Sequence, residues 1–154
     1  MSRVLIGVDI DDTIAIWRVE PPYLANPDPE ASGILHAWLD AGVADIVYIT
    51  SRKRERCEET RGWLSEHGFP LPDTVLFEED IPLGKPAALR ALGAVALIDD
   101  MPGTMAAAAS EGLYAFWRDI PKNRHMPPPE KHPRLIPWRN WSEVDARVRR
   151  HPLR

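Results

Sequence analysis

The chain has 154 residues, of which 44% are apolar and 27% are charged, a balance typical of one globular domain that buries a core. It has a single cysteine, Cys57, and no apolar run near the roughly 20 residues that cross a bilayer. These features argue against a disulfide-stapled secreted protein and against a membrane protein, and they favour the cytoplasm. The formal net charge is −4, but residues 122–154 form a basic end that could bind an anionic partner or simply be solvated.

Short apolar runs that predict buried strands alternate with amphipathic segments that predict helices. The strands are expected at 4–8, 45–50, 74–77, 94–98 and 113–117. The helices are expected at 30–42, 51–68, 84–93, 103–112 and 142–150. This alternation is the pattern of βαβ units, so we expect an α/β fold in which helices cover both faces of a parallel sheet.

Two proline-rich stretches interrupt the alternation. Residues 14–29 contain four prolines and predict an irregular flap that carries Trp17, Tyr23 and Leu24. Residues 118–140 are too many for an ordinary connector and predict a loop that either binds a ligand or wraps along the surface. No second core is apparent, so residues 1–154 are expected to form one domain.

Acidic and hydroxyl side chains gather where the predicted strands end. Open parallel sheets bind ligands beyond the carboxyl ends of their strands, and several carboxylates at one edge repel each other unless a cation is present. A hard divalent ion with oxygen ligands, Mg²⁺ above all, would relieve this repulsion. The residues at these positions are Asp9, Asp11, Asp12, Thr13, Thr50, Ser51, Arg52, Asp99 and Asp100, with Lys85 at the start of the helix that precedes the fourth strand.

The order D-x-D-x-T, T/S, K and D-D resembles the four motifs of the haloacid dehalogenase superfamily of aspartate-nucleophile phosphohydrolases. VDIDDT matches the first motif, YITSR the second, the lysine of GKPAAL the third and LIDD the fourth, so the resemblance covers residues 3–117. It implies a Rossmann-like fold with five parallel strands in the order 5-4-1-2-3, numbered along the chain. Only 38 residues separate Asp11 from Thr50, which implies a minimal cap formed by the flap 14–29.

The resemblance also assigns roles. Asp9 is expected to be the nucleophile that forms an aspartyl-phosphate, and Asp11 the general acid and base. Thr50 is expected to donate a hydrogen bond to a phosphoryl oxygen, and Lys85 to balance negative charge. The Mg²⁺ ligands implied are Asp9, Asp99, Asp100 and the backbone carbonyl of Asp11, although the sequence leaves open which of the two later aspartates binds the ion directly.

The remaining first- and second-motif residues are expected to bind substrate. They are Ser51, Arg52 and Thr13, of which Thr13 acts mainly through the geometry of its loop. As an acid at neutral pH, Asp11 needs surroundings that raise its pKa above the ordinary value of about 3.9. Asp12 stands where the family often has glycine, which puts the loop conformation in question.

The expected reaction is hydrolysis of a phosphate monoester, with a nucleotide or a nucleic-acid end as the substrate. Basic residues crowd positions 52–56, and Trp138 and Trp141 could stack on bases, although a solvated helix and packed tryptophans explain the same residues. The LIDDMP segment resembles 5′(3′)-deoxyribonucleotidases, and residues 50–77 resemble the 3′-phosphatase domain of polynucleotide kinase-phosphatases. The alternatives are a phosphatase of another small ester, an idle metal-binding scaffold, and a receiver-like signalling domain, whose lysine would follow a different strand.

Overall fold

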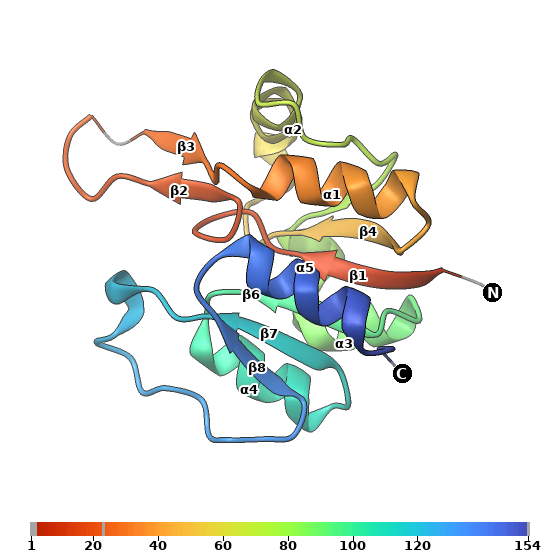
Figure 1. Cartoon of the computed structure of the whole chain (residues 1–154). Helices are drawn as coiled ribbons and strands as arrows, with labels where there is room; N and C mark the ends of the chain where they lie inside the picture. The colour runs from red at the N-terminus through yellow and green to blue at the C-terminus, as the bar shows by residue number, and fades with distance from the viewer. Residues whose placement is uncertain (1–2, 23, 154) are drawn as a thin grey trace.

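The computed structural model describes residues 3–22 and 24–153 and has a central six-stranded sheet in the order β5-β4-β1-β6-β7-β8 (Figure 1). Every neighbouring pair in this sheet is parallel. The five predicted strands are present in the predicted relative order, with one more strand at the edge. The strands are β1 (Val4–Val8), β4 (Ala44–Ile49), β5 (Val75–Leu76), β6 (Ala96–Asp99), β7 (Tyr114–Arg118) and β8 (Leu135–Trp138).

Helices cover both faces of the sheet, as predicted. One face packs against α1 (Ala31–Asp40), α2 (Cys57–Glu66) and α5 (Trp141–Arg150), and the other against α3 (Lys85–Ala91) and α4 (Pro102–Ser110). The predicted helix at 51–68 is shorter, because its first turn is the 3₁₀ helix η1 (Arg54–Arg56). Within the described ranges, none of the helices has the length and apolar character needed to cross a bilayer.

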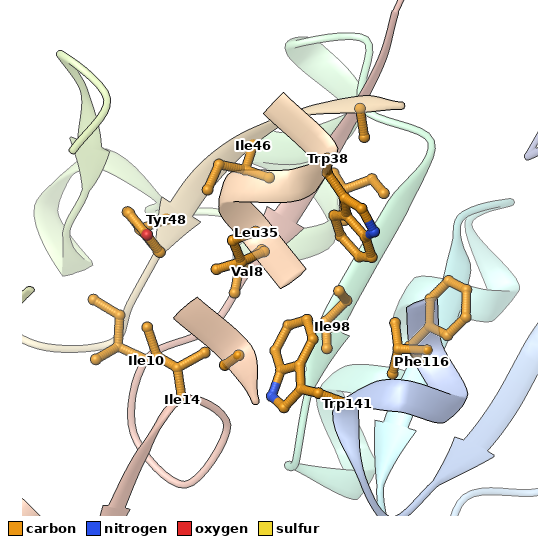
Figure 2. Packing of buried hydrophobic residues seen from close by; sticks show 14 of the residues in the cluster. Val8, Ile10, Ile14, Leu35, Trp38, Ile46, Tyr48, Ile98, Phe116 and Trp141 are labelled. Atoms are coloured by element: carbon orange, nitrogen blue, oxygen red, sulfur yellow. The ribbon is translucent and has the colours of Figure 1, made fainter. Parts of the chain in front are cut away.

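The larger core lies under α1 and α5. Figure 2 shows Val8 of β1 and Ile98 of β6 beside Leu35 and Trp38 of α1 and Trp141 of α5. The Trp38 and Trp141 rings lie 6.2 Å apart between centroids, and the Trp138 and Trp141 rings 5.3 Å apart. Trp138 and Trp141 are therefore core residues, and the hypothesis that they stack on bases is wrong.

The prediction that residues 14–29 hold no regular element is wrong. Strands β2 (Ala15–Trp17) and β3 (Ala25–Pro27) form an antiparallel hairpin, which extends beyond the carboxyl ends of the parallel strands (Figure 1). The prolines do not prevent pairing, because Pro21 and Pro22 lie in the connection and Pro27 ends an edge strand that needs no further donor. Tyr23, which the sequence assigned to this flap, lies outside the described residues.

The prediction that residues 118–140 form a proline-rich loop is wrong for part of the segment. The segment contains a 3₁₀ turn, η3 (Pro121–Asn123), and ends in β8, which adds a sixth strand beside β7. Pro137 pairs with Trp117 in this ladder, and a proline is tolerated there because β8 is an edge strand with one side of its backbone unpaired. The predicted C-terminal helix at 142–150 is present as α5.

Gly7 in the middle of β1 lets α3 pack directly on the strand that leads to Asp9. A methyl group at this position would lie 2.6 Å from Leu89 Cδ1, and Leu89 is fully buried. We expect Gly7→Ala to lower the free energy of unfolding by about 1–3 kcal/mol through overpacking, measured by urea denaturation. Gly33→Ala is the control: a methyl group at Gly33 contacts nothing within 4 Å in α1, so this change should be stabilising by about 0.5–1 kcal/mol. Equal effects of both changes would contradict this account.

Candidate active site

The carboxyl ends of β1, β4 and β6 bring the predicted site residues to one edge of the sheet. Asp9 follows β1, Thr50 follows β4, Asp99 ends β6, and Lys85 begins α3. Figure 1 shows the β2–β3 hairpin on this same side of the sheet. All four residues are buried, the most exposed being Lys85 at 7%.

Three aspartates and one lysine form the centre of the site. One carboxylate oxygen from each of Asp9, Asp99 and Asp100 lies within 4.8 Å of the others. Lys85 Nζ donates to Asp9 Oδ1 and to Asp99 Oδ2, each at 2.7 Å. One cation thus faces three buried carboxylates, and the cluster has excess negative charge.

This excess charge shifts the pKa values of the cluster. Burial, followed by repulsion from Asp99, raises the pKa of the Asp9 carboxyl well above its usual range. The same two causes raise the pKa of Asp100 to about 6. The pKa of Lys85 lies above its ordinary value although burial lowers it, because the charges of Asp9 and Asp99 outweigh the loss of solvation.

Asp99 and Asp100 differ in how their oxygens are used. Asp99 Oδ1 accepts from the backbone N–H groups of Asp100 and Met101, and its Oδ2 accepts from Lys85. Asp100 Oδ2 accepts from Asn123 Nδ2 at 2.7 Å. Asn123 was missed from the sequence, because it lies between prolines in a stretch without periodicity.

A tight loop holds the first-motif residues after β1. The backbone N–H groups of Thr13, Ile14 and Ala15 all donate to Ile10 O, and the Thr13 hydroxyl donates to Asp9 Oδ2 at 2.9 Å. Thr13 O accepts from Arg118 Nη1 and from Trp141 Nε1. Thr13 thus fixes the Asp9 carboxylate and ties its loop to the C-terminal half of the domain.

Asp12, where the family often has glycine, adopts a left-handed backbone with φ of 61°. Aspartate tolerates this conformation better than most residues. Its side chain accepts from Trp17 N and forms an ion pair with Lys122 at 2.7 Å. The loop keeps its turn without glycine.

Asp11 is held by Arg52 and Trp17. Arg52 donates to both carboxylate oxygens, at 2.9 and 2.5 Å, and Trp17 Nε1 donates to Oδ1 at 2.6 Å. Partial burial raises the pKa of Asp11, but the hydrogen bonds from Arg52 and Trp17 outweigh it and bring the pKa below its ordinary value. The prediction that the surroundings raise this pKa is wrong for the free protein, because the sequence did not reveal the Arg52 contact.

The second-motif residues differ in exposure. Thr50 is fully buried, and its Oγ1 accepts from Arg52 N at 3.1 Å, whereas Ser51 is exposed. Arg54 pairs with Asp80 and Arg56 with Glu59. The basic run at 52–56 is therefore largely neutralised by neighbouring carboxylates.

A pocket of about 350 Å³ opens beside Asp11, between the β2–β3 hairpin and α2. We call it the hairpin pocket. Trp17 and Arg52 line this pocket, and both also donate hydrogen bonds to the Asp11 carboxylate. Its lining residues are Trp17, Leu24, Ala25, Arg52, Glu59, Trp63 and His67.

Comparisons with known proteins give one sequence relative and one structural neighbour of interest. No family model matches the chain. Over 100 residues, or 65% of its length, the chain is 24% identical to a Bacillus cereus protein named "Putative nucleotidase". The match covers 51% of that protein, so the chain spans about half the length of this relative.

One solved structure with a similar fold is the cobalt-bound form of the deoxy-D-mannose-octulosonate 8-phosphate phosphatase from Haemophilus influenzae. The two chains share 12% sequence identity and superpose with a TM-score of 0.60, over 96% of this chain and 87% of the other. The prediction of an α/β fold with a central parallel sheet is thereby confirmed. The chain therefore shares the fold of this phosphatase, and its four motifs resemble those of the haloacid dehalogenase superfamily.

Proposed function

We propose that the protein is a Mg²⁺-dependent phosphomonoesterase that acts through an aspartyl-phosphate on Asp9, with a nucleotide or a nucleic-acid terminal phosphate as substrate. The observation that carries the proposal is the buried cluster of Asp9, Asp99 and Asp100 around Lys85 at the carboxyl edge of the sheet. The fold shared with a sugar phosphate phosphatase and the match to a protein named as a nucleotidase support it. The sole cysteine is consistent with a cytoplasmic location, which is part of the proposal.

The donor set fits a divalent cation. Three buried carboxylates face a single ammonium group, and oxygen-rich sites of this kind suit Mg²⁺, which also keeps waters that a phosphate can replace. Asp9, Asp100 and the backbone carbonyl of Asp11 would hold the ion. Asp99 would lie behind them, because it already accepts three hydrogen bonds, two from the backbone N–H groups that follow it and one from Lys85. When bound, the ion would neutralise negative charge on the phosphoryl group.

Asp9 is the proposed nucleophile. Thr13 and Lys85 fix its two carboxylate oxygens, so little freedom is lost when it reaches the phosphorus atom. An Asp9 oxygen forms the new bond to phosphorus while the bond to the leaving oxygen breaks. Lys85 balances the charge of the phosphoryl oxygens, and the Thr50 hydroxyl and Ser51 donate hydrogen bonds to them.

Asp11 is the proposed general acid and base, and its contact with Arg52 must change during the reaction. A phosphoryl group beside Asp9 is negative, so it raises the pKa of Asp11 and competes for Arg52. The Asp11 proton then goes to the leaving oxygen. In the second step Asp11 takes a proton from the water that attacks the aspartyl-phosphate.

Assays of two phosphate esters test this proposal. The wild type should hydrolyse p-nitrophenyl phosphate and glycerol phosphate only with Mg²⁺. Asp11→Asn should lower kcat on glycerol phosphate by about 10²–10⁴-fold, and far less on p-nitrophenyl phosphate, whose leaving group needs no proton. The control Asp40→Asn changes an exposed residue at the end of α1. Turnover without metal, or equal losses on both esters, would contradict the mechanism.

Asn123 should strengthen Mg²⁺ binding without being a ligand of the ion. Its side chain donates to the Asp100 carboxylate and to the Asp100 carbonyl at 2.7 and 3.1 Å. We expect Asn123→Ala to weaken Mg²⁺ binding by about 10–100-fold, because the ligand loses its orientation. Titration calorimetry would measure this, with Asn26→Ala, an exposed residue of β3, as control. Unchanged affinity in Asn123→Ala would rule out this role.

A further inference from the structure

The hairpin pocket has no part in the phosphoryl-transfer steps described above, although it opens directly beside Asp11. We propose that this pocket binds the nucleoside part of a nucleoside monophosphate, with the base against Trp63 and Trp17. The inference rests on the proposed function, and it narrows the substrate to a single nucleotide. The volume of the hairpin pocket, about 350 Å³, is in the range of small-molecule sites, about 300–1,000 Å³.

The position of the pocket follows from the role of Asp11. A general acid must contact the oxygen that joins phosphorus to the leaving group, so the leaving group begins at Asp11. The two residues that hold the Asp11 carboxylate, Arg52 and Trp17, are also walls of the pocket. A leaving group that extends from Asp11 therefore enters the pocket.

The lining of the pocket favours a flat ring. Trp17, Trp63 and His67 contribute three aromatic side chains. Trp63 is held in place, because its ring stacks on Phe69 with 5.5 Å between centroids and its Nε1 donates to Ala25 O of β3. A fixed aromatic face suits base stacking, which does not depend on base identity. Glu59 lies at the wall and can accept hydrogen bonds from sugar hydroxyls.

The charges around the pocket favour a mononucleotide over a polynucleotide. Affinity for a nucleic-acid chain comes from unpaired basic side chains along its backbone. Here Arg56 pairs with Glu59, Arg54 pairs with Asp80, and Arg52 faces Asp11. These three arginines are thus already neutralised by carboxylates, and the aromatic pocket remains as the main recognition element.

Substrate competition tests the inference. For the wild type, kcat/KM on nucleoside 5′-monophosphates or 3′-monophosphates should exceed that on glycerol phosphate by at least about tenfold. Trp63→Leu should lower this ratio about tenfold, the loss expected for one stacked base, whereas Trp63→Phe keeps a ring and should retain most of it. The control Leu92→Ala removes an exposed apolar side chain at the other end of α3 from Lys85 and should leave the ratio unchanged.

Two outcomes of the assay would overturn the inference while the proposed function stands: equal kcat/KM on nucleotides and glycerol phosphate, or a ratio that does not change in Trp63→Leu. Preference for a 3′-phosphorylated oligonucleotide with a steep salt dependence would also overturn it.

Binding of a free nucleoside tests the pocket without catalysis. Adenosine and thymidine should bind the Asp9→Asn variant, and Trp63→Leu introduced into that variant should weaken binding about tenfold. This result would support nucleoside binding in the pocket even if the protein hydrolysed no ester. The absence of hydrolysis would refute only the proposed function. Absence of nucleoside binding at millimolar concentrations would refute the pocket.

Discussion

Replacement of Asp9 by asparagine is expected to lower kcat for every phosphate ester by at least about a thousandfold, because the amide cannot form the aspartyl-phosphate. The carboxylate that is lost is the one fixed by Lys85 at 2.7 Å and by Thr13 at 2.9 Å. Among the described residues, no other carboxylate has both contacts, so the neighbouring acids cannot replace it. Single-turnover hydrolysis of p-nitrophenyl phosphate with saturating Mg²⁺ would measure the loss.

A matched control lies three residues further along the same loop. Asp12 is also an acid after β1, but its side chain pairs with Lys122 and has no part in the proposed chemistry. Asparagine tolerates the left-handed backbone at this position, so Asp12→Asn should fold normally and keep kcat within about threefold. If Asp9→Asn retained activity, or if both changes abolished it equally, Asp9 would not be the nucleophile.

The site could be predicted from the sequence where chemistry and topology coincide. Asp9 and Asp99 end strands that the apolar runs define, and parallel strands bring their carboxyl ends to one edge. Lys85 begins a helix whose preceding turn returns the chain to that same edge. The four motifs occur in the expected order along the chain, so the central cluster could be predicted without knowledge of side-chain contacts.

The remaining features depend on contacts that leave no local pattern. Strand β8 was missed because Pro137 reads as a break, and only its place at the sheet edge makes it tolerable. The ion pair between Asp11 and Arg52 joins residues 41 positions apart, and it reversed the expected pKa shift. Asn123 contacts Asp100, and Trp63 lines the hairpin pocket, from segments that look like a loop and a surface helix in the sequence.

Replacement of Lys85 by methionine is expected to destabilise the metal-free protein strongly at neutral pH. Lys85 is 7% exposed and is the ion-pair partner of both Asp9 and Asp99. Removing one partner of a buried ion pair typically costs about 3–5 kcal/mol, which corresponds to a fall in Tm of about 6–20 °C for a domain of this size. Lys122→Met is the control: its ion pair with Asp12 is at the surface and should contribute less than about 1 kcal/mol.

The loss of stability in Lys85→Met should depend on pH, in a direction set by the pKa values of the aspartates. The pKa values of Asp9 and Asp100 are raised in the folded state, so protonation of these two carboxyls stabilises the folded protein. This contribution to the free energy of unfolding is complete below the ordinary carboxyl pKa. It is lost as the pH rises through about 6, the pKa of Asp100. Without Lys85, the buried charged Asp9 carboxylate destabilises the folded protein more. The difference in Tm between wild type and variant in EDTA should therefore be larger at pH 8 than at pH 5. Mg²⁺ should restore part of the stability at pH 8, because it replaces the missing positive charge. A loss of equal size at both pH values would show that Lys85 acts through packing rather than through charge.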